Sequence, residues 1–275
     1  MNADRTLLTD SMWAELSPLL PGQANCRGTT ARDTRGFVEA VLWLGRTGVG
    51  WRDLPPHLEH WHRVYVRFAR WREAGTRRAC GSGWRTCSSP TSGRFRIRAS
   101  GRCNSIRPAS ASTSTQPGRP KKRSAIYPQS IGRSRGGRTS KLHLRCDGAG
   151  NVLGWVLTPG QAGDCPEAAG LLAPWLAPWL APWLAPAQEV VADTAYDSDA
   201  LRGLIAAAGA IAVIPPNPRR RNIPHFDPCA YGKRYHIEQP FNKLKQHRRL
   251  ATRYDKLDAS FESFLCARIW ILYLN

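Results

Sequence analysis

The sequence predicts a mixed α/β fold, with helices flanking a sheet, preceded by a small all-α region. Three observations lead to this prediction. Residues 129–275 alternate short apolar strands with helical segments, which is typical of a mixed sheet covered by helices. Residues 1–75 contain three amphipathic helical segments. Residues 76–128 follow no strand or helix period and are rich in Arg, Ser, Gly and Pro, which predicts an irregular basic segment between two domains.

The composition indicates a polyanionic partner. The chain of 275 residues has 40 Lys and Arg against 20 Asp and Glu, a net charge of +20, which favours nucleic acid over a neutral substrate. No apolar run reaches the roughly 18 residues needed to span a bilayer, and the N-terminus lacks a signal-peptide core, so we expect a cytoplasmic protein without a membrane partner. The eight cysteines show no C-x2-C spacing of a zinc site.

The N-terminal region predicts three helices in order. Thr9 or Asp10 can cap the first, and Pro21 ends it. The second is expected over 33–47 and the third over 61–72, where apolar residues recur at helical spacing.

The third helix carries arginines on the side opposite its apolar stripe. Three short helices ending in a basic amphipathic one resemble a helix-turn-helix DNA reader, which makes Arg63, Arg67 and Arg70 candidate DNA contacts. A small bundle with a solvated arginine face remains an alternative. Phosphate contacts from such a face would make DNA binding fall steeply with salt.

The C-terminal region predicts strands and helices in alternation. Strands at 139–146 and 152–157, joined by a Gly-rich turn, form a hairpin. The remaining expected elements are a helix from near 164, a strand at 189–193, a helix at 198–208, a strand at 210–214, a basic loop at 215–224, and helices near 231–250 and 257–273. The unit LAPW occurs three times between Leu172 and Trp183, a proline-bearing period that does not suit a regular helix.

Asp193 is the first candidate for chemistry. It follows a short apolar strand, and a carboxylate at the carboxyl end of a strand lies where α/β folds place active sites. A role as a helix N-cap is an equal alternative for Asp193, and it is the preferred reading for Asp197 and Ser198.

A second candidate is the set Tyr231, Arg234, Glu238 and Lys245. At about 100° per residue these side chains project from one helix within an arc of about 60°. One acid among three potential DNA contacts suits a metal ligand beside a phosphodiester. The alternative is a solvated basic helix face.

These four residues form the pattern Y-x2-R-x3-E-x6-K, which resembles the signature of bacterial insertion-sequence transposases of the Asp-Asp-Glu (DDE) type. The resemblance extends through six further blocks in collinear order, among them IGRSRGGRTSKLH and VVADTAYDSDAL. It implies a ribonuclease-H-like catalytic domain over 129–275 and N-terminal helices that bind the element's terminal inverted repeats.

The resemblance also implies the roles of the site residues. Asp193 would be the second acid and Glu238 the third, both ligating Mg²⁺ or Mn²⁺, while Tyr231, Arg234 and Lys245 would contact DNA. Metal-held carboxylates suit in-line attack on phosphorus, as in DNA cleavage and strand transfer. The partners would be the terminal repeats and target DNA, with association with the nucleoid. A homo-oligomer in the synaptic complex is left open.

The chain departs from the family at the first acid, because no Asp or Glu occurs between residues 74 and 146. Codons for 105–108 exist that read Asp-Ser-Thr in another frame, so we hypothesise that part of 76–128 is translated out of frame and that the first sheet strand is missing. Pro240, two residues after Glu238, should kink the signature helix or delay its start.

These departures predict an impaired transposase. The alternative is a non-catalytic DNA-binding remnant that represses or inhibits transposition. A plain nuclease without terminal-repeat preference is a third class, and an RNA-binding protein is the weakest, because no aromatic-basic platform is present.

Overall fold

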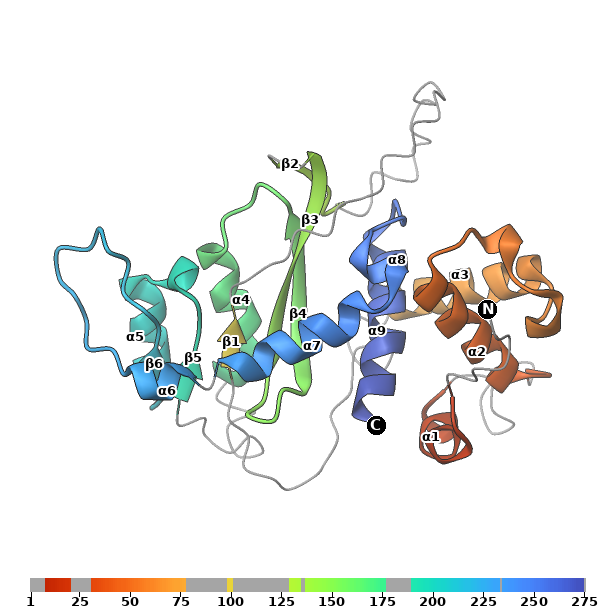
Figure 1. The fold of residues 1–275 in the computed structure, drawn as a ribbon, viewed down its shortest axis with the longest axis horizontal. Coiled ribbons are helices and arrows are strands. Elements are labelled where there is room, and N and C mark those ends of the chain that lie inside the picture. The colour runs from red at the N-terminus through yellow and green to blue at the C-terminus, as the bar shows by residue number, and fades with distance from the viewer. Residues whose placement is uncertain are drawn as a thin grey trace. The chain divides into compact units, whose positions relative to one another are not determined.

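The computed structural model describes residues 8–20, 31–77, 98–100, 129–134, 137–176, 189–232 and 234–274 (Figure 1). The chain divides into two compact units. Unit 1 comprises residues 1–87 and 244–275, and unit 2 comprises residues 88–243. Within the described residues, no helix combines the length and apolarity needed to cross a membrane.

Unit 1 is all-helical in the described residues. Its helices are α1 (Asp10–Leu16), α2 (Thr34–Thr47), α3 (Trp61–Arg77), α8 (Arg248–Ala251) and α9 (Asp258–Tyr273). The predicted cap of the first helix is confirmed, because the Thr9 hydroxyl accepts a hydrogen bond from the Met12 amide at 3.3 Å. Asp33 caps α2 in the same way, accepting from the Gly36 amide at 2.8 Å.

The core of unit 1 joins segments far apart in the sequence. Trp51 and Phe68 lie 5.0 Å apart between ring centroids, and Phe264 of α9 lies 4.8 Å from Phe68. The last helix therefore packs on α3 and α2. Residues 244–275 thus share a core with the N-terminal helices, because apolar contacts and not sequence proximity decide which helices pack together. The predicted catalytic domain over 129–275 stays a prediction.

The three arginines proposed as DNA contacts on α3 differ in their surroundings. Arg63 and Arg70 are exposed. Arg67 is half-buried, donates to the Asp33 carbonyl at 2.7 Å and to the Thr34 hydroxyl at 2.8 Å, and its guanidinium stacks 4.4 Å from the centroid of Phe37. Its guanidinium is thus engaged in holding α3 to the start of α2. A helix-turn-helix role stays a prediction that rests on Arg63 and Arg70.

His247, which precedes α8, makes unit 1 sensitive to acid. Burial, helped by the charges of Arg268 and Arg46, lowers its pKa from 6.5 to about 3. Below about pH 6.5 His247 therefore binds a proton in the unfolded chain but stays neutral in the folded chain. The free energy of unfolding falls by about 1.4 kcal/mol per pH unit between about pH 6.5 and 3.

We expect urea-unfolding free energies to drop between pH 7 and 4.5, and the His247→Gln variant to lose about 2–3 kcal/mol less over that interval. An equal drop in both proteins would show that His247 does not titrate on unfolding.

Unit 2 contains the predicted hairpin. Strand β3 (Gly137–Cys146) pairs antiparallel with β4 (Val152–Pro159), and the short strand β2 (Gly132–Ser134) pairs with the beginning of β3. Asp147 builds the turn, because its carboxylate accepts from the amides of Ala149 and Asn151, both at 2.9 Å. The mixed α/β class is confirmed for this unit.

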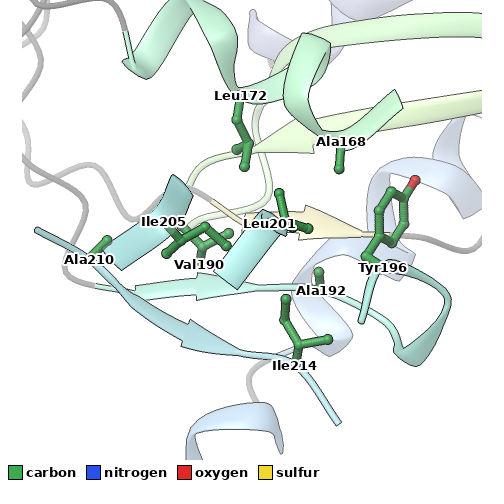
Figure 2. Packing of buried hydrophobic residues seen from close by; sticks show 9 residues of the cluster. All are labelled: Ala168, Leu172, Val190, Ala192, Tyr196, Leu201, Ile205, Ala210 and Ile214. Carbon is green, nitrogen blue, oxygen red and sulfur yellow. The ribbon is translucent and has the colours of Figure 1, made fainter. Parts of the chain in front are cut away.

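A parallel pair of strands completes the sheet elements. Strand β5 (Glu189–Val191) pairs parallel with β6 (Ile211–Val213), connected through α5 (Asp199–Ala207), whose predicted Ser198 cap is confirmed. Helix α4 (Cys165–Leu176) packs on β3 and β4 and continues through the first LAPW unit. Figure 2 shows the core that joins α4, α5 and the two strands. It consists of Ala168, Leu172, Val190, Ala192, Tyr196, Leu201, Ile205, Ala210 and Ile214.

One strand lies inside the segment predicted to be irregular. Strand β1 (Arg98–Ser100) pairs antiparallel with the end of β3 and contacts β5. Strand pairing uses backbone groups, so a short strand forms there whatever its side chains are. The prediction that the family's first sheet strand is missing from this chain stays a prediction. The hypothesis of an out-of-frame segment stays a prediction, and residues 105–108 lie outside the described residues.

Candidate active site

Asp193 lies two residues beyond the carboxyl end of β5. Its carboxylate caps the 3₁₀ helix Thr194–Tyr196 by accepting from the Thr194 amide at 2.7 Å, so the capping role considered from the sequence is present. That bond uses Oδ1. Oδ2 faces Arg234, and the side chain is 19% exposed, so the cap leaves one oxygen directed at the candidate site.

The signature segment forms two helices where one was expected over 231–250, and the second begins close to Glu238, as the delayed start expected from Pro240 requires. Helix α6 (Pro228–Gly232) carries Tyr231, and α7 (Tyr235–Lys245) carries Glu238 in its first turn. Arg234 lies between them, its amide donating to the Tyr231 carbonyl at 2.9 Å. The arc calculated for one continuous helix therefore does not apply to Tyr231.

Pro240 lies inside α7 without ending it. Its ring nitrogen offers no hydrogen to the His236 carbonyl, which would be its partner in a regular helix. That carbonyl instead approaches Gly150 of the β3–β4 turn so closely that a Cβ on Gly150 would lie 2.7 Å from it. Gly150 also has φ +90°, so only glycine suits this contact between the hairpin and the helix that bears Glu238.

The two acids converge on one cation. Nη2 of Arg234 lies 3.4 Å from Oε1 of Glu238 and 3.9 Å from Oδ2 of Asp193. The side chain of Arg234 is 18% exposed and that of Glu238 is 57% exposed. Residues 45 positions apart in the chain thus present carboxylates to a shared guanidinium. Their catalytic roles stay a prediction.

Apolar contacts hold Tyr231 beside this centre. Val191 and Val213, at the ends of β5 and β6, form a cluster with Ala230, against which Tyr231 and Phe226 pack. The guanidinium of Arg234 lies 5.7 Å from the centroid of the Tyr231 ring, near the outer limit of a cation–π contact. Lys245, the last residue of α7, is exposed and belongs to unit 1, so its place in the site stays a prediction.

A buried polar chain supports the turn that follows Asp193. Nδ1 of His143, on β3, lies 2.6 Å from the Tyr196 hydroxyl, and Nε2 lies 3.0 Å from the Thr158 hydroxyl on β4. The Tyr196 amide donates to the Asp193 carbonyl at 2.9 Å. Burial lowers the pKa of His143, which favours the neutral imidazole in this hydrogen-bonded group. The sequence reasoning missed it, although a histidine among alternating strand residues was a signal.

The donor atoms suit a divalent ion only in part. Carboxylate oxygens are the ligands that Mg²⁺ and Mn²⁺ prefer, and Asp193 and Glu238 supply them. Among the described residues, however, no three acidic, His or Cys side chains gather as metal ligands would. The pair fits one weakly held ion, for which Arg234 is a competing cation.

Comparisons with known proteins indicate the family of the chain. Residues 81–274 match the family model "Transposase DDE domain", and residues 8–80 match "Putative transposase of IS4/5 family". The chain is 42% identical over 137 residues to "Putative transposase for insertion sequence element IS6501" of Brucella ovis, covering 48% of this chain and 98% of that protein. It is 35% identical over 68 residues to "Uncharacterized protein y4sN" of Sinorhizobium fredii, covering 25% of this chain and 54% of that one. No solved structure matches.

The first of these family models spans well over half of the chain, including β5, Asp193 and the whole Tyr231–Lys245 signature. The resemblance stated from the sequence is therefore confirmed. The family acts on DNA through cleavage and strand transfer and uses divalent metal ions. This chain belongs to the DDE-type insertion-sequence transposases.

Proposed function

We propose that Asp193 and Glu238 are the second and third acids of the transposase centre and together hold one Mg²⁺ or Mn²⁺ ion. The observation that carries the proposal is their approach to the same nitrogen, Nη2 of Arg234, from different elements. When bound, such an ion activates an attacking oxygen or stabilises a leaving one on phosphorus.

Arg234 has a second part in the proposal, as a ligand of the DNA backbone. Its Nε and Nη2 are buried and make no hydrogen bond among the described residues, although Nη2 lies within ion-pair distance of both carboxylates. Buried donors without acceptors cost free energy, and phosphate oxygens are the acceptors that a planar guanidinium matches best. A phosphodiester bound here would satisfy Arg234 and draw it away from the two carboxylates, leaving these free for the ion.

We further propose that this copy is impaired. The chain supplies no acid between residues 74 and 146, where the family's first ligand belongs. Strand β1 pairs with β3 and contacts β5, but the residues 98–100 that form it are Arg, Ala and Ser, none of which supplies a carboxylate. Two acids without the third would bind an ion weakly and cleave DNA slowly.

A non-catalytic DNA-binding remnant is the second candidate. The absence of a three-ligand group among the described residues favours it. In both cases unit 1 would recognise the terminal inverted repeats, with Arg63 and Arg70 of α3 as exposed phosphate contacts. Binding as a homo-oligomer at paired ends, and association with the nucleoid, would follow from that recognition.

The experiment is cleavage of a labelled terminal-repeat duplex in Mg²⁺ or Mn²⁺, with Asp193→Ala and Glu238→Ala as variants. We expect the unchanged chain to bind the duplex preferentially over a scrambled one and to nick it at a slow, metal-dependent rate that both variants abolish. Preferential binding with no nicking at all would favour the remnant. Nicking that survives either substitution would refute the assignment of that acid.

A further inference from the structure

The loop between β6 and α6 is strongly basic and extends away from the strands (Figure 1). It contains the run Arg219, Arg220 and Arg221, preceded and followed by prolines at 218 and 224. The signature of the family does not include this loop. All of it lies in unit 2, with the Asp193 turn.

A buried carboxylate anchors the loop to the turn that bears Asp193. The side chain of Asp197 has no exposed surface, and it accepts from Nε of Arg202, from Nη1 of Arg220 and from the amide of Asn217, each at 2.8 Å. Burial would raise the pKa of Asp197, but these hydrogen bonds outweigh it and keep the pKa below its ordinary value. Asp193 and Asp197 cap the two ends of the same 3₁₀ helix, so the anchor and the candidate site share one rigid turn.

The anchor uses only the middle arginine of the run. Arg220 binds Asp199 as well as Asp197, and its charge and that of Arg202 are balanced by these two acids. Asn217 tightens the loop further, because its side-chain oxygen accepts from the Arg219 amide and its carbonyl from the Arg220 amide, both at 3.0 Å.

The two flanking arginines point outward as a result. Arg219 and Arg221 are both exposed, and neither makes an ion pair with another residue in the described part of the chain. The loop therefore displays two unbalanced guanidinium groups on a backbone that is held in place. A guanidinium matches phosphate oxygens through paired hydrogen bonds, and preordering of the loop lowers the entropy lost on binding.

We propose that Arg219 and Arg221 form a phosphate clamp on the DNA strand that enters the Asp193 centre, with the Asp197–Arg220 anchor as its positioning device. The inference rests on the proposed function, since it assumes that DNA is bound at that centre. Contacts of this kind fix the position of the duplex and carry no sequence preference.

The test compares two double variants of the full chain with the same loss of charge. Arg219→Gln/Arg221→Gln removes the clamp. Arg133→Gln/Arg138→Gln removes an exposed cross-strand pair of arginines on β2 and β3 of the same unit. Binding of a fluorescent duplex carrying the terminal repeat is titrated without metal between 50 and about 200 mM salt. Circular dichroism verifies that both variants fold.

The clamp variant should lower the slope of log affinity against log salt by about 1.8, the value for two lost phosphate contacts, on both repeat and scrambled duplexes. The control should change the slope by less than half as much. Equal changes in the two variants, or an unchanged slope in the clamp variant, would overturn the proposal while leaving the proposed function intact. Failure of the unchanged chain to bind either duplex would instead refute the proposed function.

Discussion

Replacing Asp255 with Ala should destabilise unit 1 by about 3–5 kcal/mol, because it leaves a buried arginine without its counter-charge. Asp255 receives both Nε and Nη2 of Arg249, at 2.9 and 3.1 Å, and the two side chains are only 9% and 6% exposed. The Arg249 side chain cannot easily rotate into solvent, because its guanidinium also stacks 4.5 Å from the centroid of the Phe264 ring and donates to the Val49 carbonyl at 3.0 Å.

The measurement is urea unfolding followed by tryptophan fluorescence. Asp10→Ala is the matched control, because it removes an acid from an exposed pair with Arg35 in the same unit and should cost under about 1 kcal/mol. The double variant Arg249→Met/Asp255→Ala should recover part of the loss, since no charge is then left buried. A cost for Asp255→Ala no larger than that for Asp10→Ala would contradict the account.

Restoring the first acid should raise the rate of metal-dependent DNA cleavage by about 100-fold or more. Under the proposed function, a gene in which two compensating frame changes encode Asp-Ser-Thr near residues 105–108 would supply a third ligand beside Asp193 and Glu238. Loss of supporting interactions around a metal alone costs about 10–100-fold, so loss of a ligand itself should cost at least the upper value.

The comparison is the nicking rate of the restored and unchanged chains on the same terminal-repeat duplex. An Ala-Ser-Thr version with the same frame changes separates the acid from any gain in folding. Equal rates for the Asp and Ala versions would refute the assignment of the missing ligand to this segment.

Local signals predicted the local structure well. Thr9 and Ser198 cap the helices expected of them, because an N-cap depends on one side chain and the next three amides. The hairpin of β3 and β4 follows from alternating residues around a turn whose Asp147 carboxylate binds nearby amides.

Long-range packing could not be predicted in the same way. The sequence gives no local sign that Phe264 of α9 packs on Phe68, or that Arg249 is buried over Trp51. Arg67 shows the same limit, because a basic helix face can serve DNA or bind the neighbouring helix, and here its guanidinium is engaged by Asp33 and Thr34.

The candidate site was predictable in part. The end-of-strand position indicated Asp193, and the four-residue spacing of Arg234 and Glu238 survives as an ion pair in spite of the helix break. The late start of α7 at Tyr235 agrees with the delay expected from Pro240. The buried contact of His143 with Tyr196 depends on tertiary neighbours and was not foreseen.

The central claim is that Asp193 and Glu238 share one ion, and Mn²⁺ titration followed by electron paramagnetic resonance tests it most directly. The unchanged chain should bind Mn²⁺ weakly, and Asp193→Asn and Glu238→Gln should each lower the affinity at least about tenfold. Because ligands of one ion act together, the double variant should lose little more than either single one. Losses that add as for independent sites, or binding that is unaffected by one of the substitutions, would contradict a shared centre.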